Sequence, residues 1–281
     1  MLRGAEKAER IPSEPDLGNA SVGIGTEIDK IERDFRRRGH VPGAGMAPFC
    51  FAEGTEGRMA GKMEGTVVIV AGGPMGDPAY LRAELEACRP KAVIAADGGA
   101  RHLLAAGTVP DLIVGDMDSL SPEERAVFER RGSRIEIFPA AKDETDTQLA
   151  LLKALAMPCR EIRIYGALGG RLDHTLANCS LLVLAAERGV AARLLDEDCE
   201  VFVVTSQRGI EGRKGQTVSV FPLSSRVTGI ELTGFDFPLR GAVMAPGNPY
   251  GVSNRLSGPQ GTIRVAEGIL LVIRYFRTDL R

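Results

Sequence analysis

The sequence predicts an α/β domain with a mostly parallel sheet, followed by an all-β sandwich. From Thr66 onward, short β-branched runs alternate with segments of helical spacing, and the helical segments stop near Gln207. Beyond that residue, short strands are separated by turns rich in Gly, Pro and Ser. We therefore divide this part of the chain into an α/β domain over residues 63–206 and a β-sandwich domain over residues 207–281.

Five short apolar runs have the composition of buried parallel strands, which are covered on both faces and need no polar alternation. They are TVVIVAG (66–72), KAVIAADGG (91–99), DLIVGDMDS (111–119), RIEIFPA (134–140) and EIRIYGA (161–167). A segment with helical spacing follows each run. Two helix starts are clearly marked: Ser121 precedes Pro122 as an N-cap residue, and Thr145 and Gln148 have the spacing of a capping box.

The C-terminal part contains only strand-like runs. They are the runs QTVSVFPL (216–223), VTGIELTGF (227–235), FPLRGAVMA (237–245) and GTIRVAEGILLVIRYF (261–276), and a predicted strand pair, ARLLDEDCEVFVVTSQ (192–207), precedes them at the end of the α/β region. Residues 216–223 and 268–276 are expected to be the best buried strands. Residues 1–62 are rich in Gly, Pro and charge, which predicts a disordered N-terminal extension.

The composition excludes several classes of protein. The 281 residues carry a formal net charge of −2, so no general attraction to nucleic acid is expected. The five cysteines show no CxxC spacing, which argues against a disulfide framework or a zinc site and fits a reducing cytoplasm. No apolar stretch approaches the ~20 residues that cross a bilayer. We expect a cytoplasmic protein with no nucleic-acid or membrane partner.

Glycines or charged residues follow each of the five predicted parallel strands. The carboxyl ends of parallel strands meet at one edge of the sheet, where open α/β sheets bind their ligands. The residues delivered to this edge are Gly73, Asp97, Asp116, Asp118, Lys142, Asp143, Asp146, Arg171, Asp173 and His174. The sequence therefore predicts a ligand site at this edge.

The acidic residues at this edge suit a divalent cation. Asp116 and Asp118 lie two positions apart, so an extended chain would point both side chains the same way. A few carboxylates, completed by waters and substrate phosphates, suit Mg²⁺, and Asp97 and Asp146 reach the same edge. A plain turn with Ser119 as a capping residue is the open alternative.

Two glycine-rich loops can approach an anion. The loop AGGPMGD contains Gly73, and its backbone N–H groups can come close to phosphate, but no Walker A lysine follows. The loop GALGGRLDH leads into a helix N-terminus, with Arg171 as a bidentate phosphate donor. Asp173 fits the N-cap of this helix, and a structural role is open both for it and for His174.

Five segments resemble the thiamine pyrophosphokinase family in their order and spacing: ADGGA, GDMDS, KDETDTQLAL, GGRLDHTLAN and GNPYGVSNRL. The resemblance covers roughly residues 66–277. It implies an α/β ATP-binding catalytic domain, a β-sandwich that binds thiamine, and a homodimer whose pocket is completed across the subunits. The implied reaction transfers a diphosphate group from ATP to the hydroxyethyl oxygen of thiamine, giving thiamine diphosphate and AMP, with Mg²⁺ as cofactor.

The resemblance also implies roles for individual residues. Asp116, Asp118 and Asp146 match the metal-binding set, with Asp97 in support. The expected ATP-binding residues are Gly73, Asp97, Lys142, Asp143, Arg171 and His174, and the expected thiamine-binding residues are Asp173, Thr175, Ser253 and Asn254. The expected catalytic residues are Asp146, Arg171 and Asp173, and either carboxylate is a candidate to take the hydroxyl proton. Some family members hold the thiamine ring with tryptophan, which this chain lacks; Tyr250 and Leu256 are the candidate substitutes.

Three other functions stay open at this point. In a Rossmann-type NAD-dependent oxidoreductase, AGGPMG would bind the dinucleotide and Asp97 the ribose, which leaves Asp116, Asp118 and Asp146 unexplained. In a metal-dependent glycosyltransferase, Asp116 and Asp118 would hold the metal of a nucleotide sugar. In a non-catalytic nucleotide-sensing module, the β domain would dock a partner.

Overall fold

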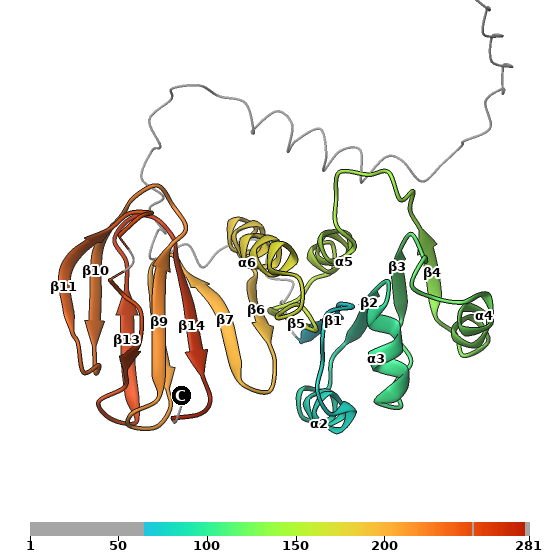
Figure 1. Cartoon of the computed structure of the whole chain (residues 1–281), viewed down its shortest axis with the longest axis horizontal. Helices are drawn as coiled ribbons and strands as arrows, with labels where there is room; N and C mark the ends of the chain where they lie inside the picture. The colour runs from blue at the N-terminus through green and yellow to red at the C-terminus, as the bar shows by residue number, and fades with distance from the viewer. Residues whose placement is uncertain (1–64, 249, 279–281) are drawn as a thin grey trace, which may run out of the picture. The chain divides into compact units, whose positions relative to one another are not determined.

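The computed structural model describes residues 65–248 and 250–278 (Figure 1). The extension predicted over residues 1–62 lies outside the described residues. The helices are α2 (Pro78–Cys88), α3 (Gly99–Ala105), α4 (Pro122–Arg130), α5 (Asp146–Leu155) and α6 (Leu172–Glu187). Among the described residues, no helix has the length and apolar character that a membrane crossing requires.

The strands alternate with these helices first and then follow one another directly. The first six are β1 (Thr66–Val70), β2 (Ala92–Ala96), β3 (Leu112–Gly115), β4 (Arg134–Ile137), β5 (Glu161–Tyr165) and β6 (Ala191–Leu195). The others are β7 (Cys199–Val204), β8 (Gln207–Glu211), β9 (Thr217–Pro222), β10 (Val227–Thr233), β11 (Leu239–Met244), β12 (Asn254–Arg255), β13 (Gln260–Arg264) and β14 (Leu270–Tyr275). The predicted α/β region followed by an all-β region is confirmed.

A ten-stranded sheet runs through both regions, in the order β12-β9-β14-β7-β6-β5-β1-β2-β3-β4. The strands from β6 to β4 are parallel, and β7, β14, β9 and β12 continue the sheet in antiparallel pairs. The chain builds outward from β1 through β2, β3 and β4, and then returns to pair β5 with the other side of β1. This reversal of strand order beside β1 is the point at which open α/β sheets bind ligands.

Helices cover both faces of the parallel strands (Figure 1). One apolar cluster contains Leu149 of α5 and Leu182 of α6, and a second on the other face contains Leu81 of α2, Leu103 of α3 and Phe128 of α4. All residues of β1 and β2 are buried. The continuous apolar runs of these strands follow from burial on both faces.

A second sheet, in the order β11-β10-β13-β8, forms the other layer of the β-sandwich. Its side chains share an apolar cluster with β7, β9 and β14. The expectation that residues 216–223 and 268–276 would supply well-buried strands is confirmed by β9 and β14. Two strands were not predicted from the sequence: β8, an edge strand with Gly209 at its centre, and the two-residue strand β12. The expected boundary at 206/207 falls between β7 and β8, although the ten-stranded sheet continues through β7.

Local side chains explain where two helices begin. Ser121 and Glu124 form a reciprocal capping box at α4. Thr145 accepts a hydrogen bond from Gln148 N (3.1 Å) at the start of α5, as expected. The expectation that Asp173 caps α6 is wrong: the N-cap residue is Arg171, because the chain turns sharply before it at residues 169–170, where both glycines have positive φ.

A row of ion pairs crosses the junction between the parallel and antiparallel strands. Glu200 of β7 is buried, and its carboxylate oxygens lie 3.0 Å from Arg193 Nη1 of β6 and 2.8 Å from Arg274 Nε of β14. Arg193 also pairs with Glu161 of β5. These contacts connect four adjacent strands, so Glu200 neutralises two half-buried arginines at once.

We expect Glu200→Ala to lower the free energy of unfolding by ~3 kcal/mol, because it leaves two partly buried arginines without this carboxylate. Urea denaturation measures the change. The control is Arg277→Ala, which removes an exposed ion pair with Asp198 (3.2 Å) and should cost less than ~1 kcal/mol. Equal losses in the two variants would contradict the importance of the buried row.

Candidate active site

A cleft of about 490 Å³ opens where the strand order reverses. Its walls come from the loops that follow β1, β2, β3 and β5 and from the N-terminal turns of α5 and α6. The lining residues are Ala71, Gly72, Gly73, Pro74, Ala96, Asp97, Gly98, Asp116, Asp118, Ser119, Thr145, Asp146, Thr147, Gly166, Ala167, Gly169, Arg171, His174 and Asn178. Seven of the residues expected from sequence therefore share one cavity: Gly73, Asp97, Asp116, Asp118, Asp146, Arg171 and His174.

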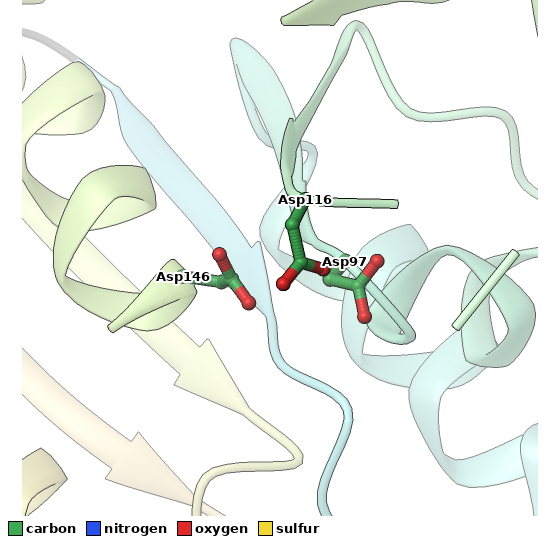
Figure 2. Close-up of side chains that lie close together, drawn as sticks. All are labelled: Asp97, Asp116 and Asp146. Carbon is green, nitrogen blue, oxygen red and sulfur yellow. The ribbon is translucent and has the colours of Figure 1, made fainter. Parts of the chain in front are cut away.

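Three carboxylates meet at the floor of this cleft. Asp97 follows β2, Asp116 follows β3, and Asp146 is the first residue of α5. Each offers an oxygen within 4.8 Å of the other two. Figure 2 shows Asp146 facing Asp116 and Asp97 from the opposite side of the cleft.

The environment of these carboxylates fits a divalent cation. Asp97 Oδ1 and Asp146 Oδ1 are buried and have no hydrogen-bond partner. Lys142 Nζ lies 3.0 Å from Asp146 Oδ1, close enough for an ion pair but without hydrogen-bond geometry. Burial raises the pKa of Asp97, and the nearby charges of Asp146 and Asp118 add to this effect. Buried carboxylate oxygens without a hydrogen bond are unfavourable by themselves, and carboxylate oxygens are the hard ligands that Mg²⁺ prefers.

The backbone around the cluster is held in uncommon conformations. Asp97 has a backbone φ of 42° and Met117 one of 63°. Both values lie in the left-handed region, which residues other than glycine rarely adopt. Met117 is fully buried in the core, which fixes the turn between Asp116 and Asp118. The expectation of an extended chain here is therefore wrong, and Asp118 is exposed and lies outside the three-carboxylate cluster. Its part in metal binding stays a prediction.

Arg171 and Asp173 form an exposed pair at the start of α6. Arg171 Nη2 lies 2.5 Å from Asp173 Oδ2, and Nε lies 3.1 Å from Oδ1. The hydrogen bonds from Arg171 lower the pKa of Asp173 to about 2. In this state Asp173 is a weak proton acceptor, and the Nε and Nη2 groups of Arg171 that bind it become available to phosphate only when this pair opens.

Six other expected residues do not line the cleft. Lys142, Asp143, Asp173, Thr175, Ser253 and Asn254 are not among the lining residues. Thr175 Oγ1 donates a hydrogen bond to Gly169 O (3.2 Å), and this bond supports the loop before α6. Gly73 lines the cleft, but its N–H group already donates to Gly166 O (2.8 Å), so it is not free for an anion.

Asn254 holds an exposed aromatic residue that the sequence did not single out. Its Nδ2 donates to Phe237 O (2.7 Å), and its Oδ1 accepts from Phe237 N (3.1 Å). Asn254 is buried, whereas Phe237 is 69% exposed. Leu256 was a candidate for ring stacking and is wrong for that role, because it is fully buried in the sandwich core. Tyr250 is exposed, and its hydroxyl donates to Val243 O (2.6 Å).

Asn178 was also missed, because its signal is a single buried amide within an apolar helix. Its Nδ2 donates to Ala167 O (2.9 Å), and this bond anchors the loop that carries Arg171 to the body of α6. A polar residue on the buried face of a predicted helix could have drawn attention to it.

Gly115→Ala is expected to disrupt the carboxylate cluster. Gly115 has φ 151°, and an added Cβ would lie 2.8 Å from Asp97 Cβ and 3.2 Å from Asp146 Cγ. We expect at least a tenfold loss of Mn²⁺ affinity, measured by electron paramagnetic resonance, because the side chain would separate the ligands. The control is Gly132→Ala, which has a similarly positive φ of 97° but meets nothing within 4 Å. A similar loss of Mn²⁺ affinity in both variants would mean that backbone strain, not the cluster, determines binding.

Comparisons with known proteins agree with the resemblance found in the sequence. Two family models match, thiamin pyrophosphokinase catalytic domain over residues 86–194 and thiamin pyrophosphokinase vitamin B1 binding domain over residues 203–270. The thiamine pyrophosphokinase of Bacillus subtilis (strain 168) is 34% identical over 213 residues, which cover 74% of this chain and 98% of that protein.

Two crystal structures extend the similarity to the fold. The thiamine pyrophosphokinase structure from Bacillus subtilis has a TM-score of 0.66 at 33% identity. The match covers 76% of this chain and 100% of that chain. The structure from Geobacillus thermodenitrificans has a TM-score of 0.64 at 31% identity, with 76% of this chain and 99% of that chain covered. These matches do not favour the oxidoreductase or nucleotide-sensing alternatives. The family predicted from the five segments is confirmed, and the chain belongs to the thiamine pyrophosphokinase family.

Proposed function

We propose that this protein transfers a diphosphate group from ATP to thiamine and so forms thiamine diphosphate and AMP. The observation that carries the proposal is the three-carboxylate cluster at the strand-order reversal of a chain that belongs to this family. Diphosphate transfer depends on positioning and on charge neutralisation more than on covalent catalysis. A cleft with acidic, basic and glycine-rich walls supports this chemistry.

Asp97, Asp116 and Asp146 are the residues that would hold Mg²⁺, with Asp118 at the exposed margin of the same cleft. When bound there, the ion would neutralise phosphate oxygens and polarise the phosphorus that is attacked. The chain's own contribution is to fix the three carboxylates from three separate loops. Thr145 caps α5 and so holds Asp146 at the helix start, where the helix dipole also favours its negative charge.

Arg171 is the proposed donor to the phosphates, together with Lys142 and His174, and Asp143 stays a predicted residue of the ATP site. At 72% exposure its side chain has room to turn from Asp173 toward the cleft that it already lines. Guanidinium groups bind phosphate oxygens in a bidentate manner, and this would offset charge that develops on the AMP leaving group.

The same movement would prepare Asp173 to accept a proton. The pKa of Asp173 is about 2 because Arg171 hydrogen-bonds to it. Loss of that partner to a phosphate would return the pKa toward the ordinary range of a carboxyl group, which makes a stronger base. We therefore favour Asp173 over Asp146 as the acceptor of the thiamine hydroxyl proton, since Asp146 belongs to the carboxylate cluster.

Phe237 is the proposed aromatic partner of the thiamine ring. Its exposed ring and its fixed backbone provide a flat surface for a cationic aromatic ligand. Asn254 would then act by placing Phe237, and Ser253, exposed at φ 59°, lies next to it in the chain.

A homodimer would bring this surface to the cleft. Ser253 and Asn254 do not line the cleft of their own chain. The β domain exposes apolar side chains at Phe237, Val243, Tyr250 and Val252, which a subunit interface would cover. We propose that the thiamine pocket is completed by the β domain of a second copy.

The purified protein should convert ATP and thiamine to equal amounts of AMP and thiamine diphosphate, and only with Mg²⁺ present. Chromatography of both products checks this, and sedimentation equilibrium checks the dimer.

Asp146→Asn should cut kcat by at least about 100-fold with little change in melting temperature, because it removes a proposed ligand of the metal. The matched control, Glu129→Gln on the exposed side of α4, should leave both unchanged. ATP binding without formation of thiamine diphosphate would favour a nucleotide sensor instead.

Phe237→Ala should raise the KM for thiamine about tenfold, because it removes a stacking surface worth roughly 1–2 kcal/mol. The KM for ATP should stay unchanged, and Phe237→Tyr should retain most of the thiamine affinity. Steady-state kinetics with each substrate varied separately provides the measurement. Val243→Ala, another exposed apolar position of the β domain, is the control. A larger rise in the KM for thiamine in Val243→Ala than in Phe237→Ala would mean that this apolar surface of the β domain serves subunit contact alone.

A further inference from the structure

The loop between β1 and α2 forms one wall of the cleft through Gly72, Gly73 and Pro74. The backbone of Gly166 supports this loop on one side, since Gly73 N donates to Gly166 O (2.8 Å). A Cβ on Gly73 would lie 2.4 Å from the same oxygen, so the two segments are in close backbone contact. At the far end of the loop, Asp77 N donates to Glu197 Oε1 (2.9 Å).

The peptide between Gly73 and Pro74 can present only a carbonyl group, because proline has no N–H. If that carbonyl turned into the cleft, its partial negative charge would face an anionic ligand. No rotation of this peptide could offer a donor in its place. The direction of Gly73 O therefore matters for anion binding, and it needs a fixed partner.

His102 provides that partner from α3. The half-buried ring places Nε2 at 2.9 Å from Gly73 O. Because a carbonyl oxygen only accepts, Nε2 must carry the proton, and both the corresponding neutral tautomer and the imidazolium can donate it. The helix itself is held tightly against β1, since a Cβ on Gly99 would lie 1.9 Å from Val70 O. The ring is thus attached to a fixed support.

We propose that His102 is a positioning residue for nucleotide binding, which acts by holding Gly73 O out of the phosphate-binding space. The inference rests on the proposed function, because it takes a nucleotide phosphate as the ligand of this cleft. His102 does not line the cleft, so its effect passes through the loop rather than through direct contact.

Two substitutions at this position test the proposal. His102→Leu removes the donor and keeps similar bulk, whereas His102→Gln keeps an N–H donor on a side chain of similar reach. With one hydrogen bond lost, we expect His102→Leu to raise the KM for ATP about fivefold to tenfold. The kcat and the KM for thiamine should stay within about twofold of the wild-type values, because the bond acts on the nucleotide wall alone. His102→Gln should restore most of the affinity for ATP.

Arg82→Ala is the matched control for a purely structural effect. Arg82 Nε donates to Ala106 O (2.8 Å) at the end of α3, so this variant also loses a bond from a side chain to the backbone of the same region. Both Arg82→Ala and His102→Leu should lower the melting temperature, because each removes a hydrogen bond, but Arg82→Ala should leave the KM for ATP unchanged. An equal rise in this KM in both variants would overturn the positioning role.

Calorimetric titration of the full chain with Mg²⁺ and a non-hydrolysable ATP analogue, without thiamine, separates this proposal from the proposed reaction. Weaker binding in His102→Leu with recovery in His102→Gln supports the inference even if the wild-type protein makes no thiamine diphosphate. Unchanged analogue binding in His102→Leu overturns it even if the wild-type protein is fully active.

Discussion

The parallel pairing of β1 with both β5 and β2 is the constraint on which the site depends. The chain leaves β1 in one direction along the sheet and returns on the other side of it, so the loops after these strands diverge and leave a cleft between them. Buried, uninterrupted apolar strands make this pairing possible, since helices cover both faces. The charged residues at the strand ends would have no common location without it.

Close backbone contact turns that opening into a shaped site. Gly99 lies against Val70 O, Gly73 against Gly166 O, and Gly115 against the side chains of Asp97 and Asp146. At each place a side chain would enter space that the neighbouring segment already fills. The glycines thus serve two purposes: they allow three loops to converge, and they let the carboxylates approach one another within metal-ligand range.

The electrostatic organisation of the cleft follows from the same convergence. Asp97, Asp116 and Asp146 are unfavourable neighbours without a cation, and the burial that raises the pKa of Asp97 makes this more pronounced. Lys142 offsets part of the charge beside Asp146. At the start of α6, Arg171 and Asp173 neutralise one another, so Lys142 and Arg171 both start in ion pairs. Binding of Mg²⁺ and phosphate would exchange these internal pairs for contacts with ligand.

The sequence by itself determined the order of elements in the α/β region, the α/β and β-sandwich classes, the family, and the set of loops that form the site. These features depend on local patterns in the sequence. The patterns are the spacing of apolar residues, N-cap residues such as Thr145, and short motifs that place charged residues after strands. Only the tertiary structure decided which carboxylates meet. Asp118 is two residues from Asp116, yet it is separated from the cluster because the burial of Met117 imposes a left-handed turn. Likewise, Asn254 is buried beneath Phe237, and His102 reaches Gly73 across 29 positions of chain. Such contacts join residues that are distant in sequence, and only packing of the whole core brings them within a hydrogen bond of one another.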